Sequence, residues 1–427
     1  MDGLPPGRWT LPIVVLALIV NAVPALAQDA EGEQAQDTVL ARANLAGPNQ
    51  VDNQLEEDAL LKRSLFDFTF LQPWNDFKAD FKESSGFGFG LDYTSLYFKG
   101  TESLGTDEAG SGNLRLFGSW ELVGRESANR GAVVWKVEHR HGYTDVPVSG
   151  LGFELGYVGL QGAPFNDAGF LLTNLYWRQG LVDGRLVLVG GWVDATDYLD
   201  IYGLVSPWLH FSNFAFGTGS ATIPAPNQGL GLAAGFWASD KVYVLGGFAD
   251  SNSDPTRPGD GFDSFFDQNE FFKHIEVGWT TSRDRAYLDN IHVTFWHADE
   301  RVEANVPDGW GVNVSGALFV KDRWLPFLRG GYAQDGGSLL ETSVSTGVGY
   351  LTGPAAHVLG LGLNWGRPNE STFSPGLDDQ FAVEAFMRIQ VANQVAITPD
   401  IQFIVSPALN PEVSSLWLFG IRGRLSL

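Results

Sequence analysis

From Gly86 to the C-terminus, apolar and polar residues alternate with a period of two, and this pattern constrains the fold of the 427-residue chain most strongly. The segments 310–320, 380–391 and 415–427 show it clearly, because an extended chain places alternate side chains on opposite faces. About sixteen such segments follow one another, with roughly 25 residues per strand and connection, as in large membrane barrels. Alternation on this scale predicts an all-β protein.

The connections between these segments alternate in length. Asp183-Gly184 predicts a tight hairpin turn, because both residue types accept a positive φ. The segments 239–241 and 321–323 look similarly short, whereas 194–228, 251–269 and 299–309 are long. Short turns on one rim and long loops on the other are typical of outer-membrane barrels. We therefore predict a transmembrane antiparallel β-barrel of about sixteen strands with a short N-terminal helix.

The N-terminal part divides into three pieces ahead of a barrel at 84–427. Residues 1–27 combine a positive end, an apolar run and Ala25-Leu26-Ala27, which predicts a secretory signal peptide. Residues 28–58 are polar and acidic, which indicates a flexible leader. In 59–83, three aromatic residues recur at helical spacing with lysines on another face, which predicts a short amphipathic helix packed on its own protein, on a lipid surface or on a partner.

Composition excludes several classes of function. The 27 Lys and Arg residues against 50 Asp and Glu give a net charge of -23, so a nucleic-acid phosphate backbone would be repelled. The absence of Cys excludes a disulfide scaffold and a Cys-ligated metal. With 44% hydrophobic residues the chain can bury a large core, which argues against disorder.

Four stretches resemble the carbohydrate-selective porins (OprB-type) of Gram-negative outer membranes. The first is Leu175-Tyr176-Trp177-Arg178-Gln179 followed by Asp183-Gly184-Arg185-Leu186 and Asp194-Ala195-Thr196-Asp197-Tyr198, which is similar to a central hairpin of the family. The others are Thr294-Phe295-Trp296-His297-Ala298-Asp299, Asp378-Asp379-Gln380-Phe381-Ala382-Val383-Glu384-Ala385-Phe386, and Ile397-Thr398-Pro399-Asp400-Ile401-Gln402 with Pro407-Ala408-Leu409-Asn410-Pro411.

The resemblance spans roughly 75–427 and implies a single sixteen-stranded barrel that passes sugars. Its implied partners are sugars as solutes, outer-membrane lipid and the barrel assembly machinery, with a homo-oligomer left open. Two positions depart from the family pattern. Leu427 stands where members end in an aromatic residue, which bears on assembly, and Trp192 replaces a common Lys, which bears on one lumen charge.

A sugar channel needs polar side chains for hydroxyl groups and aromatic rings for C–H faces. The faces opposite the apolar ones supply both, with acids and bases two or four residues apart. The alternative for each residue is a lattice that only satisfies lumen charges. The predicted lumen residues are Arg115, Glu121, Lys136, Glu138, Arg140, Tyr176, Arg178, His274, Glu276, His292, Trp296, Glu384, Arg388, Arg422 and Arg424.

The long loop 194–228 is expected to fold inward and narrow the pore. It is rich in aromatic residues that would stack on sugar rings or, alternatively, pack the loop itself. These constriction-loop residues are Tyr198, Tyr202, Trp208, Phe211, Phe214 and Phe216.

No cofactor or covalent chemistry is expected. His139 and His141 have a spacing suited to zinc but share a face with apolar residues. Asp250, Asn252 and Asp254 begin like a calcium loop, yet Pro255 stands where that loop needs Gly, so a solvated acidic loop is the alternative.

The predicted function is passive diffusion of mono- or oligosaccharides. A general porin without sugar preference is the first alternative. A secreted all-β protein that binds or hydrolyses glycans is the second, and a barrel enzyme acting on lipids is a third for which no serine stands out. Carboxylates such as Glu121 and Glu138 could in principle cleave a glycosidic bond, but a lumen lattice accounts for them more simply.

Overall fold

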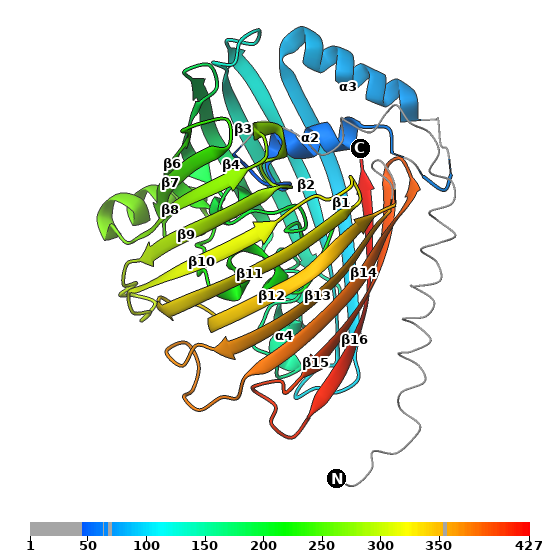
Figure 1. The fold of residues 1–427 in the computed structure, drawn as a ribbon, viewed down its shortest axis with the longest axis vertical. Helices are drawn as coiled ribbons and strands as arrows, with labels where there is room; N and C mark the ends of the chain where they lie inside the picture. Colours follow the sequence, from blue (N-terminus) through cyan, green and yellow to red (C-terminus); the bar gives the residue numbers. More distant parts are fainter. Residues whose placement is uncertain (1–44, 63, 67–70, 353–356) are drawn as a thin grey trace.

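The computed structural model describes residues 45–427, except 63, 67–70 and 353–356. The expected signal peptide and the first part of the expected leader lie outside these residues. In the described part of the chain, sixteen antiparallel strands close into one barrel (Figure 1), because β1 pairs with β16. The predicted all-β barrel is therefore confirmed, and so is the predicted number of strands.

Each strand is hydrogen-bonded to its neighbours in the sequence. The strands are β1 (Phe87–Gly100), β2 (Glu108–Val123), β3 (Gly131–Gly142), β4 (Gly169–Leu181), β5 (Leu186–Val193), β6 (Gly229–Trp237), β7 (Val242–Asp250), β8 (Phe271–Thr280), β9 (Asn290–Ala298), β10 (Gly309–Ala317), β11 (Trp324–Asp335), β12 (Leu340–Leu351), β13 (Val358–Pro368), β14 (Gln380–Ala392), β15 (Val395–Val405) and β16 (Ser415–Ser426). The helices are α2 (Val51–Ala59), α3 (Gln72–Ser85), α4 (Leu151–Glu154) and α5 (Gly261–Asp263).

The two rims of the barrel differ as the sequence predicts. The rim that carries the start of β1 and the end of β16 has tight connections such as 182–185 and 393–394. Val182, Asp183 and Gly184 all have positive φ there, which confirms the tight turn at Asp183-Gly184. The opposite rim carries 143–168, 194–228 and 251–270. Because outer-membrane barrels place short turns on the periplasmic side, we call the first rim periplasmic.

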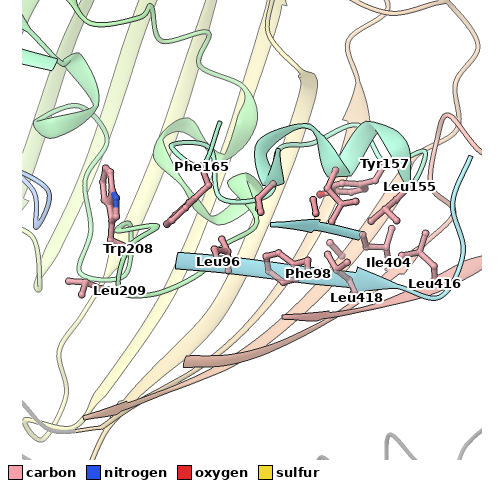
Figure 2. Close-up of a cluster of buried hydrophobic side chains, with 14 residues drawn as sticks. Leu96, Phe98, Leu155, Tyr157, Phe165, Trp208, Leu209, Ile404, Leu416 and Leu418 are labelled. Atoms are coloured by element: carbon pink, nitrogen blue, oxygen red, sulfur yellow. The ribbon is translucent and has the colours of Figure 1, made fainter. Parts of the chain in front are cut away.

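Two of the long loops fold into the barrel and form its core. Figure 2 shows Leu155, Tyr157 and Phe165 of the loop 143–168 facing Leu96 and Phe98 of β1. The same loop is held to β14, where the Gln380 side chain accepts a hydrogen bond from the Val158 amide (3.0 Å) and donates one to its carbonyl (2.7 Å). Segment 152–162 within this loop contains no strand.

The N-terminal boundaries differ from the sequence prediction. The expected flexible leader to residue 58 is wrong at its end, because 51–59 is the helix α2 with Val51 and Leu55 buried. The expected helix over 59–83 is instead α3, which has a proline in its first turn and ends at Gly86 in the left-handed conformation. Within the described residues no helix is long and apolar enough to cross a membrane.

Helix α3 lies at the periplasmic rim against β1 (Figure 1). Trp74 and Phe81 pack edge-on against Phe89 and Phe87, whose side chains lie on the outward-facing positions of β1. Phe77, which stacks between them in the helix, is 51% exposed. The aromatic face of α3 thus continues the outer, lipid-facing surface of the barrel.

Candidate functional site

The strand register points every predicted lumen residue of the sequence inward. In β14, for example, Glu384 and Arg388 are buried while Phe381 is 47% exposed on the outside. Most of the predicted set is buried, and Glu121 and Arg178 are half-buried near the periplasmic rim. His139 and His141 lie on the outer face, where His141 Nε2 is 3.0 Å from the Tyr93 hydroxyl oxygen.

A first group of lumen charges lies on β1, β2 and β16. Arg115 donates from Nε to the Asp92 carboxylate (2.8 Å), and Arg424 donates to the same carboxylate (2.8 Å). Arg424 also binds Asp58 of α2 (2.8 Å). Asp92 was missed by the sequence analysis, although the alternation of Phe87, Phe89 and Leu91 placed it on the inward face.

A second group joins β3 to the loop 194–228. Glu138 accepts hydrogen bonds from Arg140 Nε (2.8 Å) and from the Asn113 amide (3.0 Å). Lys136 Nζ lies 3.6 Å from a carboxylate oxygen of Asp197. Burial raises the pKa of Asp197 to about 7, although Lys136 acts in the opposite direction. This loop carboxyl therefore changes charge near neutral pH.

A third group anchors the middle of that loop to β8, β9 and β11. Asp200 lies 2.9 Å from His292 Nε2, and its backbone N–H donates to Glu276 (2.9 Å). Arg329 pairs with the Asp200 carboxylate and donates to the Asp200 carbonyl (2.9 Å) and the Gly217 carbonyl (2.7 Å). Arg329 was also missed by the sequence analysis, and the signal available was a lone charge within an apolar strand.

A fourth group holds the far part of the loop on β14 and β16. Glu384 accepts hydrogen bonds from the backbone N–H groups of Ser212 (2.6 Å) and Asn213 (2.9 Å). Arg422 donates to the carbonyls of Pro207 (2.8 Å) and His210 (2.6 Å). These predicted path residues bind the protein's own loop, which therefore folds inward as expected.

The aromatic residues of the loop face the wall. Tyr202 is fully buried under the Arg329 guanidinium, 4.3 Å from the ring centre. Trp208 lies 4.2 Å from the Arg115 guanidinium, and Phe211 stacks on the buried Phe216 at 4.6 Å. Phe214 is partly buried in another apolar cluster. Trp296 of β9 is likewise buried among apolar side chains. Packing of the loop, the second of the two sequence-based alternatives, is the role these contacts describe.

Helix α2 occupies the periplasmic half of the lumen. Its Asp52 pairs with Arg178, and its Glu57 lies 3.5 Å from Arg388 Nη1. The third acid, Asp58, binds Arg424 as described above. Three predicted path arginines thus meet acids of one short helix.

A cavity of about 60 Å³ remains between the segment 45–50 and the inner wall of β4 to β7. Its apolar lining is formed by residues such as Val187, Ala233 and Leu245. Its polar lining includes Tyr176, Arg178, Asp194, Asp197 and Tyr198. The buried Tyr198 hydroxyl has no hydrogen-bond partner among the described residues.

The acids of the calcium candidate have partners close by in the chain. Asp250 accepts a hydrogen bond from the backbone N–H of Asn252 (2.9 Å) and one from the Ser253 hydroxyl (2.8 Å), and Asp254 pairs with Arg257 (3.0 Å). In the part of the chain that the structure describes, no group of three or more His, Cys, Asp or Glu side chains could hold a metal ion.

A closed sixteen-stranded barrel with a charged interior, an aromatic outer surface and loops folded inward defines a porin. The family model for "Carbohydrate-selective porin, OprB family" matches residues 71–356, and the chain belongs to this family. The protein is thus an outer-membrane porin of Gram-negative type whose solutes are carbohydrates.

Solved structures show the same fold. The high-pH structure of Pseudomonas putida OprB has a TM-score of 0.65 at 15% identity, covering 83% of this chain and 97% of the other. A structure described as "Asymmetric conductivity of engineered proteins" has a TM-score of 0.51 at 12% identity, covering 80% and 100%. No curated protein matches the sequence.

Proposed function

We propose that carbohydrates cross this barrel passively, without covalent chemistry, and are recognised in the cavity between the segment 45–50 and β4 to β7. The observation that carries the proposal is the composition of that cavity. Apolar side chains line it together with two tyrosines, an arginine and two carboxylates. Sugars present C–H faces and hydroxyl edges, so this combination suits both kinds of surface.

The unpartnered Tyr198 hydroxyl supports the same site. A buried hydroxyl without a partner costs free energy, which a solute hydroxyl would recover. Of the predicted path residues, Tyr176 and Arg178 border this cavity. We assign the remaining charged residues of the predicted set to the polar lattice that lines the path and holds the loop 194–228.

The test is swelling of liposomes that contain the purified protein, with sugars compared to amino acids of matched size. Tyr198→Phe removes only the hydroxyl group, so we expect it to lower the ratio of sugar to amino-acid entry. Tyr332→Phe on the outer face is the control, because it makes the same change away from the lumen. An unchanged ratio in Tyr198→Phe would remove this cavity from the sugar path.

The second candidate function is a general porin. Entry rates through the wild-type protein distinguish it from a sugar-selective channel. Equal entry of sugars and amino acids through the wild type would leave a barrel without sugar preference. Faster entry of sugars supports a selective channel. The relative conductance of cations and anions adds an independent reading of the lumen charge.

We also propose that residues 1–27 direct export and are removed, and that the barrel assembly machinery inserts the chain. The apolar run and Ala25-Leu26-Ala27 support the first part. N-terminal sequencing of protein purified from outer membranes tests it, because the mature chain would begin at Gln28. Leu427→Phe tests the second part, since an aromatic end should raise the yield of inserted barrel.

A further inference from the structure

Helix α2 is bound inside the lumen by contacts with the barrel wall. It is nine residues long, and an isolated helix of that length is marginal in water. Its apolar side chains Val51 and Leu55 pack in one cluster with Phe117 of β2 and Val134 of β3. The wall of the barrel therefore supplies what holds this helix in place.

The acids of α2 meet arginines on three different strands of the barrel. Arg178 is on β4, whereas Arg388 and Arg424 are on β14 and β16. The paired side chains of Asp58 and Arg424 are each 8% exposed, so this pair is largely removed from water. Burial alone would raise the pKa values of Asp58 and Asp52. Because Arg424 and Arg178 stabilise the two carboxylates, both pKa values lie below their usual range.

The segments on either side of α2 are tied to the loop 194–228 and to the barrel by a few hydrogen bonds. Before the helix, the Gly47 N–H donates to the Asp197 carbonyl of that loop (2.7 Å). After the helix, the Lys62 N–H donates to the Asn393 side chain (2.7 Å), and the Leu65 and Phe66 N–H groups donate to the carbonyls of Gln390 (3.1 Å) and Val391 (2.9 Å). None of these segments is a strand of the barrel, so α2 can leave without opening the sheet.

We propose that the arginines Arg178, Arg388 and Arg424 form a carboxylate-binding site whose occupant is the chain's own helix α2, and that release of α2 opens the periplasmic end of the channel. Docked, the helix fills the lumen and occupies three arginines. Released, it exposes a basic mouth through which solutes leave. This inference deepens the proposed function, because it concerns the same pore.

The chain has no cysteine, so a single engineered disulfide can pin the segment that leads into the helix. A Cβ placed on Gly235 of β6 would lie 3.6 Å from Leu45 Cβ, within the range for a disulfide. The variant Leu45→Cys/Gly235→Cys pins the chain shortly before α2. Single-channel conductance in KCl is the readout, because it reports opening whether or not sugars are preferred.

We expect the oxidised variant to show at least a severalfold lower open probability than the same protein after reduction, with Leu45→Cys alone unaffected by oxidation. Thiol titration confirms that the disulfide has formed. Equal open probability in the oxidised and reduced forms would overturn the proposal that α2 leaves the lumen together with the segment before it.

Removal of the charges is the complementary test. The variant Asp52→Asn/Glu57→Gln/Asp58→Asn keeps the shape of α2 and removes its three carboxylates from the arginines, while Arg424 keeps its pair with Asp92. Even an exposed ion pair shifts an equilibrium by up to roughly fivefold, and the Asp58–Arg424 pair is largely buried, so the mean conductance should rise by roughly threefold or more. An unchanged conductance would contradict the role of the pairs.

The control makes the same change of charge on the neighbouring helix. Asp76→Asn/Asp80→Asn/Glu83→Gln alters α3, none of whose residues is buried, and should leave the conductance unchanged. Sugar preference is a separate readout. The proposal for α2 is contradicted if oxidation of the disulfide variant leaves its conductance unchanged. The proposed function is contradicted if the wild type passes sugars no faster than matched amino acids.

Discussion

Substitution of Arg329 is the most direct test of the contacts that attach the loop 194–228 to the barrel wall. Its guanidinium donates to Ser315 Oγ (3.0 Å) and to the carbonyls of Phe216 (3.2 Å), Gly217 (2.7 Å) and Asp200 (2.9 Å). It also pairs with the Asp200 carboxylate. Every one of these groups except Ser315 belongs to the loop 194–228. Arg329→Met keeps the volume of the side chain and removes every donor.

The magnitude follows from what the substitution leaves behind. The pKa of Asp200 lies below its usual range, because Arg329 and His292 offset the effect of burial. Removing one partner of a buried ion pair costs about 3–5 kcal/mol. The equilibrium constant for opening of the loop should therefore rise by roughly two to three and a half powers of ten, at about 1.4 kcal/mol per factor of ten.

Amide hydrogen exchange, measured in lipid vesicles, reports this opening. The Gly219 and Asp200 amides are informative, because they donate to Asp200 (2.5 Å) and to Glu276 (2.9 Å). They should exchange faster in Arg329→Met, while amides within the strands stay protected. Arg367→Met is the control, since its pair with Asp379 is exposed and contributes little.

The reasoning is refuted if the loop amides of Arg329→Met exchange as slowly as those of the wild type. In that case the contacts on β14 and β16 would hold the loop by themselves.

Three further predictions concern charge, flux and packing. Because burial raises the pKa of Asp197 to about 7, the cavity gains negative charge as pH rises through 7, so the cation-to-anion permeability ratio should rise there and stay flat in Asp197→Asn. Arg388→Ala should change sugar flux more than Arg130→Ala, whose side chain is exposed near the rim, and equal swelling rates would argue against the lumen role of Arg388. A Cβ on Gly420 would lie 2.1 Å from the buried Phe98 ring, so Gly420→Ala should lower the free energy of unfolding by about 1–3 kcal/mol in urea titrations.

The strands could be predicted because alternation is a local property. In β14 the outward side chains Phe381 and Ile389 and the inward Glu384 and Arg388 follow from sequence order alone. Once one residue of a strand is assigned to a face, the pleat assigns the rest. The tight turn at Asp183-Gly184 and the inward loop 194–228 could be predicted for the same reason, because turn chemistry and loop length are also local properties.

The lining of the pore was harder to predict from the sequence, because it depends on contacts between distant parts of the chain. Asp52 and Asp58 lie in an acidic stretch that reads as a solvated leader, and only the fold brings them to Arg178 and Arg424. The loop aromatics have the composition of a sugar-stacking surface. Whether Tyr202 faces solvent or the wall is decided by where the loop crosses the barrel, which composition does not encode.

The barrel is filled from both ends, and the two fillings meet. The cavity bordered by Gln54 and Asp58 of α2 is also bordered by Trp208 and Leu209 of the loop 194–228. A solute therefore encounters two barriers in series, whose resistances add. Widening one raises permeability only until the other limits it, so single substitutions at either end should reach a plateau. Acceleration beyond that plateau requires changes at both ends together, and their combined effect should exceed the sum of the separate ones.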